Sequence, residues 1–311
     1  MINQLLPEGF RDSLPDLANE EYKINDAFLK ILIKSGFLFV SPPLVEFESS
    51  LFLLSNESQK SESFRILDPL SQKVMAIRSD ITSQIARISC GSLSKYERPL
   101  KLCYSGEVLK VKNKNLSMSR QSTQIGAEVV GITEETVIVE IINLIVKILK
   151  KLKFKNFILN FSMPNLIKLI VKDFKLSKKD YQKLIDSFKN KNLENIKNYP
   201  EKILDMSNYL LSCIGNIDKN LNRLKKYKFE KQIKEEIETF IKLISIVKKE
   251  FPKISIFIDP LEVDEIDYHD NLSFKVYSDK YKELLSGGFY FVNSEKCIGF
   301  SGLIENLNNK M

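Results

Sequence analysis

The feature that most constrains the fold is the uneven distribution of strand-like segments along the chain. Short apolar runs typical of strands occur on both sides of a long middle stretch, for example "NFILNFS" before it and "ISIFID" after it. From Pro164 to Pro252 we find no convincing strand, only lysine-rich amphipathic helices such as "YQKLIDSF" and "EEIETFIKLISIV". We therefore predict an α+β fold, with a core of residues 1–163 and 253–311 and a helical insertion over 164–252.

Local patterns predict the elements of the first half of this core. Residues 17–35 have a helical apolar stripe, and "FLFVSPPLVE" is an apolar strand that Pro42-Pro43 ends. Asp68-Pro69 marks the turn between two strands in "FRILDPLSQKVMAIR". The helix "DITSQIARIS" is expected to have Asp80 as its N-cap, and Thr133 is expected to cap a long helix that ends near residue 151.

The remaining patterns favour a mainly antiparallel sheet with helices on one side. The segments "LKLCYSGEVLKV" and "STQIGAEVVG" are strand-like and are separated by a polar Lys/Asn hairpin over residues 110–115. Strand character returns in "LSFKVYS" and in a strand pair around Gly287-Gly288. A short helix, "FSGLIENL", is expected to close the fold.

Composition excludes several classes of function. A chain of 311 residues that is 43% hydrophobic can bury a large core, and its charge of +7 comes from lysines spread along the whole chain rather than clustered. No GxGxxG motif or P-loop is present, and a single histidine, His269, excludes a histidine-based metal cluster or a Ser-His-Asp triad. The most apolar run is interrupted by polar residues and is not a membrane span, and we see no signal peptide. The isolated cysteines, which indicate a reduced, cytoplasmic protein, are Cys90, Cys103, Cys213 and Cys297.

The segment "SRQSTQIGAEVVG" has two faces when it is placed in a strand, because side chains alternate with period two. One face is suited to a core: Thr123, Ile125, Ala127 and Val129. The other face carries an amide, a gap without a side chain and a carboxylate: Ser122, Gln124, Gly126 and Glu128. These residues can form the floor of a polar pocket for a cationic or amide-like group. They can also form the solvent-exposed face of an amphipathic strand, and the segment alone favours this second interpretation.

Five segments occur in an order that resembles a known family. They are "LLPEGFRDSLPD", "GFLFVSPPLVE", "RSDITSQIAR", "LKLCYSGEV" and "TQIGAEVVG". Together they resemble the catalytic core of histidyl-tRNA synthetase, a class II aminoacyl-tRNA synthetase. They resemble more closely its paralogue, the regulatory subunit of ATP phosphoribosyltransferase. The resemblance is dense over residues 5–131, weak in the helical insertion and partial near the C-terminus.

The resemblance implies a class II fold, with an antiparallel sheet, a motif 1 helix and strand at a dimer interface, and a substrate pocket. It implies a histidine-like ligand pocket lined by Asp80, Thr82, Gln124, Glu128 and Tyr268. The physical logic agrees, because the ammonium group of an amino acid requires carboxylates when it is buried. Gly126 is expected to leave room for the ligand. With the resemblance included, the pocket interpretation of the strand is favoured over the solvent-exposed one.

The chain departs from the synthetase pattern at positions that bind ATP. If Glu107 is the motif 2 glutamate, the position of the arginine that clamps the α-phosphate falls on Ser105, and the motif 3 arginine position falls on Asn306. The catalytic arginine of the histidine-specific loop falls near Asp264, with His269 in the second aromatic position, and the usual "GGRYD" is "GGFYF". Motif 3 falls near the end of the sequence, and no anticodon-binding domain is expected. Electrostatic contacts of this kind are usually the largest part of catalysis.

We therefore predict a non-catalytic regulatory subunit of ATP phosphoribosyltransferase that acts in the first step of L-histidine biosynthesis. By resemblance it supports a short-form catalytic subunit, relays allosteric feedback by histidine, and forms a homodimer within a larger hetero-oligomer. No cofactor or metal is expected, and neither a membrane nor a nucleic acid is a favoured partner. Two alternatives stay open: a histidyl-tRNA synthetase, and an RNA-binding paralogue of the synthetase.

Overall fold

The computed structural model describes residues 6–52, 60–61, 63–111, 119–172, 174, 176–263 and 269–309. The chain divides into two compact units, each built from several stretches of sequence. The first unit contains residues 1–133, 143–155 and 292–311, and the second contains 134–142 and 156–291. Helix α5 (Val137–Lys151) has residues in both units. Among the described helices, none is both long enough and apolar enough to cross a membrane.

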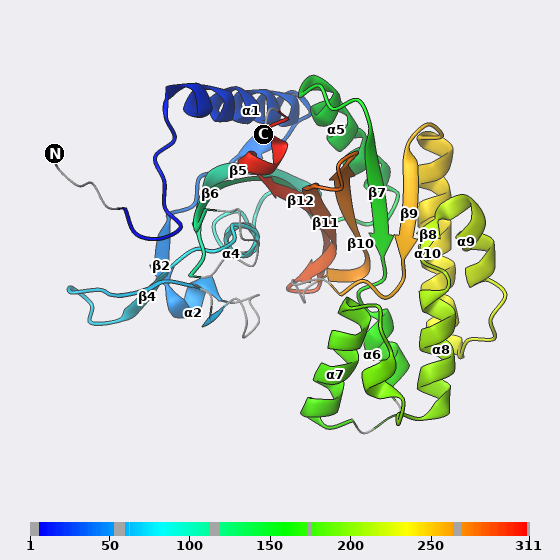
Figure 1. The fold of residues 1–311 in the computed structure, drawn as a ribbon. Helices are drawn as coiled ribbons and strands as arrows, with labels where there is room; N and C mark the ends of the chain where they lie inside the picture. Colours follow the sequence, from blue (N-terminus) through cyan, green and yellow to red (C-terminus); the bar gives the residue numbers. More distant parts are fainter. Residues whose placement is uncertain are drawn as a thin grey trace. The chain divides into compact units, whose positions relative to one another are not determined.

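The first unit contains two sheets (Figure 1). The larger sheet has the order β1-β5-β6-β12, with β1 parallel to β5 and the other pairs antiparallel. The smaller sheet has the antiparallel order β2-β4-β3. The strands are β1 (Leu38–Phe39), β2 (Val45–Phe47), β3 (Arg65–Leu67), β4 (Val74–Ile77), β5 (Leu100–Leu109), β6 (Gln121–Val130) and β12 (Glu295–Leu303). The helices are α1 (Pro15–Lys34), α2 (Glu48–Leu51), α4 (Thr82–Cys90) and the 3₁₀ helix η2 (Ile304–Leu307).

Helix α1 covers one face of the larger sheet because its apolar stripe faces inward (Figure 1). Ile24, Phe28 and Leu32 are buried at helical spacing. The ring of Phe28 lies 5.9 Å from the ring of Phe300 in β12. The helix stops just before Gly36, whose φ of 87° is a left-handed conformation that glycine adopts without strain.

The second unit is a five-stranded sheet with a set of helices. The order is β11-β10-β7-β9-β8, with β7 parallel to β9 and the other pairs antiparallel. Helix α9 packs on β8 and β9, and α10 packs on α6 and β10. The strands are β7 (Phe157–Ser162), β8 (Gly215–Asn216), β9 (Ser255–Asp259), β10 (His269–Ser278) and β11 (Glu283–Val292). The helices are α6 (Leu166–Val171), α7 (Lys178–Lys189), η1 (Glu194–Ile196), α8 (Glu201–Leu211), α9 (Ile217–Leu224) and α10 (Lys231–Glu250).

Most predicted elements are present, and four details were wrong. Helix α4 begins at Thr82, has Ile81 at its N-cap and makes no side-chain cap hydrogen bond, so Asp80 does not cap it. Helix α5 begins at Val137 rather than next to Thr133. The start of "FSGLIENL" continues β12, and only its last part is helical. We expected no strand in the stretch 164–252, but it contains one short strand, β8. This strand is defined by its pairing with β9, and no local sequence pattern indicates it. The domain bounds of the predicted insertion stay a prediction.

A candidate ligand-binding cluster on strand β6

Strand β6 is buried on both of its faces, which excludes the solvent-exposed interpretation of its polar residues. Glu128 is only 2% exposed and Gln124 only 7% exposed. The strand lies between β5 and β12 in the larger sheet of the first unit, and α4 packs against it. A carboxylate and an amide in such a position need hydrogen-bond partners, because burying an unpaired polar group costs several kcal/mol, roughly 2–7.

Gln124 binds the turn that precedes helix α4. Its side-chain oxygen accepts a hydrogen bond from the backbone N–H of Ile81 at 2.8 Å. Its amide nitrogen donates to Asp80 Oδ1 at 2.7 Å and to Ser301 Oγ at 3.2 Å. One amide thus joins three segments that are far apart in the sequence, and it places the Asp80 carboxylate beside β6.

Glu128 receives hydrogen bonds from two hydroxyl groups. Thr82 Oγ1 donates to Glu128 Oε1 at 3.2 Å, and the phenol of Tyr104 donates to the same oxygen at 3.3 Å. The two hydroxyl oxygens of Thr82 and Tyr104 are also 3.1 Å apart. We call the set Asp80, Thr82, Tyr104, Gln124, Glu128 and Ser301 the polar cluster.

Two glycines make space for the polar cluster, and Gly126 does not do so in the way that we expected. A Cβ atom on Gly126 would overlap the phenol of Tyr104 and would lie 2.9 Å from the carbonyl oxygen of Phe300. A Cβ atom on Gly299 would overlap the carboxylate of Glu128. The expectation that Gly126 leaves room for a ligand was therefore wrong, because the side chain of Tyr104 fills that space.

The polar cluster contains two carboxylates, and one oxygen of Asp80 has no described hydrogen-bond partner. Asp80 Oδ2 is buried and has no hydrogen-bond partner among the described residues. The described hydrogen bonds to Asp80 and Glu128 come from hydroxyl and amide groups. A free, buried carboxylate oxygen next to a second carboxylate favours a cationic donor such as an ammonium group. Among the described residues, no group of three or more His, Cys, Asp or Glu side chains is arranged to hold a metal ion.

Of the other predicted site residues, Ser105 and Asn306 are described in the first unit and neither is bonded to the polar cluster in the described contacts. Ser105 pairs with Ile125, and thus lies on the opposite face of the β5–β6 pair from Tyr104 and Gly126. Asn306 lies in η2, where its side-chain oxygen is buried without a described hydrogen-bond partner. Asp264 and Tyr268 lie outside the described residues, and His269 is a buried residue at the start of β10 in the second unit.

Two members of the polar cluster were missed in the sequence. Tyr104 is directly opposite Gly126 in the register of β5 and β6. A large residue that pairs with a glycine across an antiparallel sheet leans over it, so the pairing of "CYSG" with "QIGA" was the available indication. Ser301 lies in a segment that we expected to be helical, and only its pairing in β12 with Gly126 brings it to the site.

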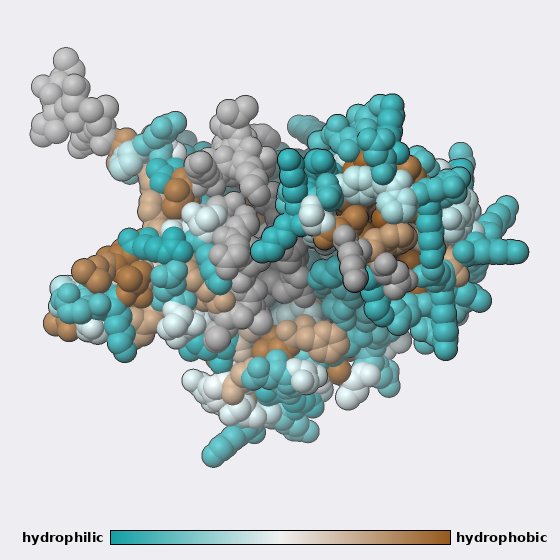
Figure 2. Space-filling view, turned by 90° about the horizontal axis from the view of Figure 1, so that it is seen from below, coloured by the Kyte–Doolittle hydropathy of each residue, from teal (hydrophilic) through white to brown (hydrophobic). Residues whose placement is uncertain are grey.

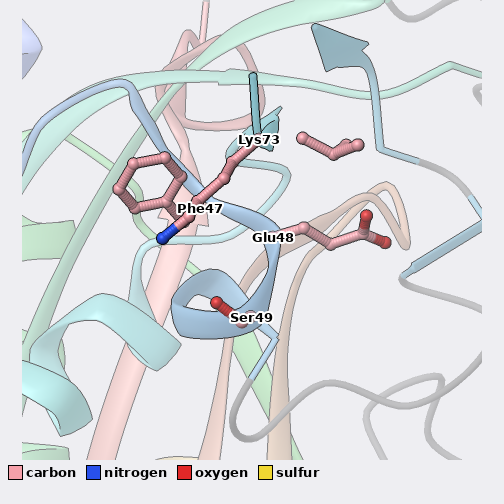
Figure 3. A pocket seen from close by; sticks show the side chains of 5 residues that line it. Phe47, Glu48, Ser49 and Lys73 are labelled. Carbon is pink, nitrogen blue, oxygen red and sulfur yellow. The ribbon is translucent and has the colours of Figure 1, made fainter. Parts of the chain in front are cut away.

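A surface depression of about 460 Å³ lies in the first unit beside the smaller sheet, and its lining includes no member of the polar cluster (Figure 3). Its lining residues are Phe47, Glu48, Ser49, Lys73 and Val74. The ammonium group of Lys73 lies 5.5 Å from the centroid of the Phe47 ring. Apolar side chains are also exposed on the nearby β3–β4 hairpin, where Leu70 is 93% exposed and Leu67 is 59% exposed; Figure 2 shows apolar surface at this edge.

Comparison with known proteins agrees with this fold. The family model for histidyl-tRNA synthetase matches residues 9–307. The regulatory subunit of ATP phosphoribosyltransferase from Gluconobacter oxydans is 30% identical over 298 residues, which are 96% of this chain and 78% of the relative. The protein of the same name from Paramagnetospirillum magneticum is 28% identical over 287 residues, covering 92% of this chain and 76% of the relative.

Solved structures show the same fold at lower identity. An ATP phosphoribosyltransferase regulatory subunit/histidyl-tRNA synthetase from Bacillus halodurans has a TM-score of 0.84 at 21% identity, covering 99% of this chain and 83% of that one. A chain of the ATP phosphoribosyltransferase (HisG:HisZ) complex from Thermotoga maritima has a TM-score of 0.67 at 20% identity, covering 91% and 97%.

The fold is that of the class II aminoacyl-tRNA synthetase core, with a buried polar cluster on its central strand. The chain belongs to the histidyl-tRNA synthetase family, and within it to the regulatory subunits of ATP phosphoribosyltransferase.

Proposed function

We propose that this chain is the non-catalytic regulatory subunit that assembles with a short-form catalytic subunit of ATP phosphoribosyltransferase in the cytoplasm. In this role it supports the first step of histidine biosynthesis and relays feedback by histidine. The family membership supports the assembly, since the complex from Thermotoga maritima contains a chain of the same fold. The chemistry of the phosphoribosyl transfer belongs to the partner.

The observation that supports a histidine ligand is the Oδ2 oxygen of Asp80, which is buried in the same cluster as Glu128 and has no described hydrogen-bond partner. An α-ammonium group supplies a charged donor for the Oδ2 oxygen of Asp80, which has no described hydrogen-bond partner. Gln124 holds Asp80 in position from the side of β6, because its amide donates to Oδ1 and leaves Oδ2 uncommitted. Histidine carries such an ammonium group, and it is the product whose level a feedback subunit of this pathway must sense.

The position of Asn306 supports a non-catalytic role. Class II synthetases hold ATP with a motif 3 arginine, and an uncharged amide does not neutralise phosphate charge. Ser105 adds nothing to this argument, because its side chain lies on the other face of the sheet. A purified preparation is therefore expected to show no histidine-dependent exchange of pyrophosphate into ATP, and measurable exchange would support a synthetase instead.

The motif 1 segment supports a homodimer within the proposed complex. Large apolar side chains are exposed on α1 and β1, namely Tyr22 at 69%, Ile33 at 51%, Leu38 at 49% and Phe39 at 48%. Apolar surface of this kind marks interaction sites in folded proteins. A two-fold interface uses the same surface patch on both copies. The segment from residue 17 to 46 carries these exposed apolar side chains, and we propose that it forms this patch.

Calorimetric titration with histidine tests the proposed ligand. Binding is expected in the micromolar to millimolar range, about −8 to −4 kcal/mol, to the chain alone or to its complex with the catalytic subunit. In parallel, the phosphoribosyltransferase activity of the complex should fall as histidine is added. A complex that neither binds histidine nor responds to it would overturn the proposed feedback role.

A further inference from the structure

Arg78 connects the polar cluster with a surface segment of the first unit. The residue is only 5% exposed. Its Nε donates to the backbone carbonyl of Glu107 at 2.7 Å, and its Nη1 donates to the carbonyl of Pro42 at 2.8 Å and to the side-chain oxygen of Gln84 at 3.2 Å. The guanidinium has a fixed planar geometry, so these contacts hold β5, the proline pair and α4 at set positions relative to one another.

The backbone of Arg78 makes the same connection a second time. Its N–H donates to the carbonyl of Leu44 at 3.1 Å, and its carbonyl accepts from the N–H of Leu109 at 2.9 Å. Residues 78–82, which we call the coupling loop, therefore begin at a point that is anchored both to the segment 42–44 and to the end of β5.

The coupling loop ends inside the polar cluster. The N–H of Ile81 and the carboxylate of Asp80 bind Gln124, and the hydroxyl of Thr82 binds Glu128. Any group that engages Asp80 or Thr82 must act on a loop whose other end is fixed at Arg78. Because the loop is short, few backbone dihedral angles can change to absorb a displacement at one end. A displacement at one end is therefore expected to reach the other end.

Helix α4 adds a parallel connection to the same surface segment. The amide of Gln84 donates to the carbonyl of Pro43 at 2.8 Å and to Glu46 Oε1 at 2.7 Å. Arg87 Nε donates to the other oxygen of Glu46 at 3.0 Å. The segment 42–47 reaches the surface, where Phe47 is 40% exposed and lines the depression in Figure 3.

We propose that the coupling loop transmits the state of the polar cluster to the surface segment 42–47, with Arg78 as the positioning residue. The identity of the ligand rests on the proposed function, whereas the connection itself is a property of this chain's own hydrogen bonds. A protein that contacts the segment 42–47 then senses whether the polar cluster is occupied.

A double-mutant cycle tests the connection without a ligand. Thr82→Val removes the hydroxyl that bonds Glu128, and Arg78→Lys removes the planar contacts at the other end of the loop. Hydrogen–deuterium exchange of the amides of residues 44–47 is the measurement. Thr82→Val alone is expected to change their exchange rates about fivefold or more, and less than about twofold when Arg78→Lys is also present.

Arg65→Gln is the matched control, because Arg65 lies in the same small sheet, bonds Glu48 at the start of α2 and does not contact the coupling loop in the described hydrogen bonds. Its effect should add to that of Thr82→Val. If Arg78→Lys does not fold, Gln84→Met replaces it, since it removes both the hydrogen bond from Arg78 Nη1 and the contacts to Pro43 and Glu46 at similar volume. Additive effects of Thr82→Val with Arg78→Lys, or with Gln84→Met, would overturn the proposal. Histidine titrated into the parent protein tests the proposed function separately.

Discussion

The side chain of Tyr104 fills the space that Gly126 leaves open directly opposite it across the β5–β6 pair. The phenol reaches through this space to donate to Glu128. Both residues are needed for the contact, because a side chain on residue 126 would occupy the position of the phenol. This pair therefore determines the shape of the polar cluster more directly than any residue that we expected to touch a ligand.

Gly126→Ala is expected to lower the free energy of unfolding by about 1–3 kcal/mol, because overpacking of a well-packed core costs about that much. The added methyl group overlaps the phenol of Tyr104 and presses on the carbonyl of Phe300, which belongs to a paired strand and cannot move away. Denaturant unfolding measures the change. Tyr104→Leu in the Gly126→Ala background removes both the ring Cζ and the hydroxyl that the methyl group overlaps, and it should recover part of the loss. An alanine variant as stable as the parent would contradict this packing.

Glu128→Gln is expected to weaken histidine binding about tenfold, about 1.4 kcal/mol, because it removes a charge-assisted contact while keeping the shape of the side chain. Glu295→Gln is the matched control on the same sheet. Glu295 pairs with Arg98, and none of its described contacts is with the polar cluster or Arg78. Calorimetric titration of both variants should show a loss only for Glu128→Gln. Equal affinities would mean that the polar cluster has a structural role alone.

Phe39→Glu is expected to produce a monomer at micromolar concentration from a parent that is at least a dimer. Phe39 is 48% exposed on the edge strand β1, and a charge on a buried apolar patch is costly to desolvate. Light scattering measures the oligomeric state. The control is Tyr281→Glu, which places the same charge on a residue that is 78% exposed in the second unit. A parent that is already monomeric would refute the predicted interface.

The buried carboxylate of Asp259 makes the stability of the second unit depend on pH. Burial raises the pKa of Asp259 to about 6, although the ammonium of Lys191 lies 2.6 Å away and opposes the shift. Glu262 and Lys275 complete the group of charges. Because the folded pKa is above the unfolded value, the contribution of Asp259 to stability is present at about pH 4 and is lost as the pH rises through 6.

Lys191→Met is therefore expected to raise the pKa of Asp259 further, since it removes the cation that favours the carboxylate. The loss of stability on raising the pH should begin near the same pH as in the parent but continue to a higher pH and become larger, as measured by denaturant unfolding at a series of pH values. Lys183→Met is the control, because Lys183 pairs only with the exposed Asp180 in the described contacts. An unchanged pH profile in the Lys191 variant would show that Asp259 does not titrate in this range.

Local sequence patterns predicted the helices and strands correctly where the spacing of the apolar residues matches the residues that the structure buries. The stripe of Ile24, Phe28 and Leu32 was enough to predict α1, because helical spacing and burial give the same answer there. The alternation in "STQIGAEVVG" was enough to predict β6 and to place Gln124 and Glu128 on one face. We added Asp80 and Thr82 to the predicted site because their segment resembles a known family. In the structure, Asp80 is bonded to Gln124 and Thr82 is bonded to Glu128.

Only the tertiary structure decided that the polar face of β6 is buried. Alternation cannot distinguish a solvent-exposed face from one that α4 and its preceding turn cover, because both have the same period of two. It also cannot show that Gly126 accommodates Tyr104, or that Ser301 arrives from a strand at the far end of the sequence. These contacts depend on strand register, which is fixed by long-range pairing and by the packing of both faces at once.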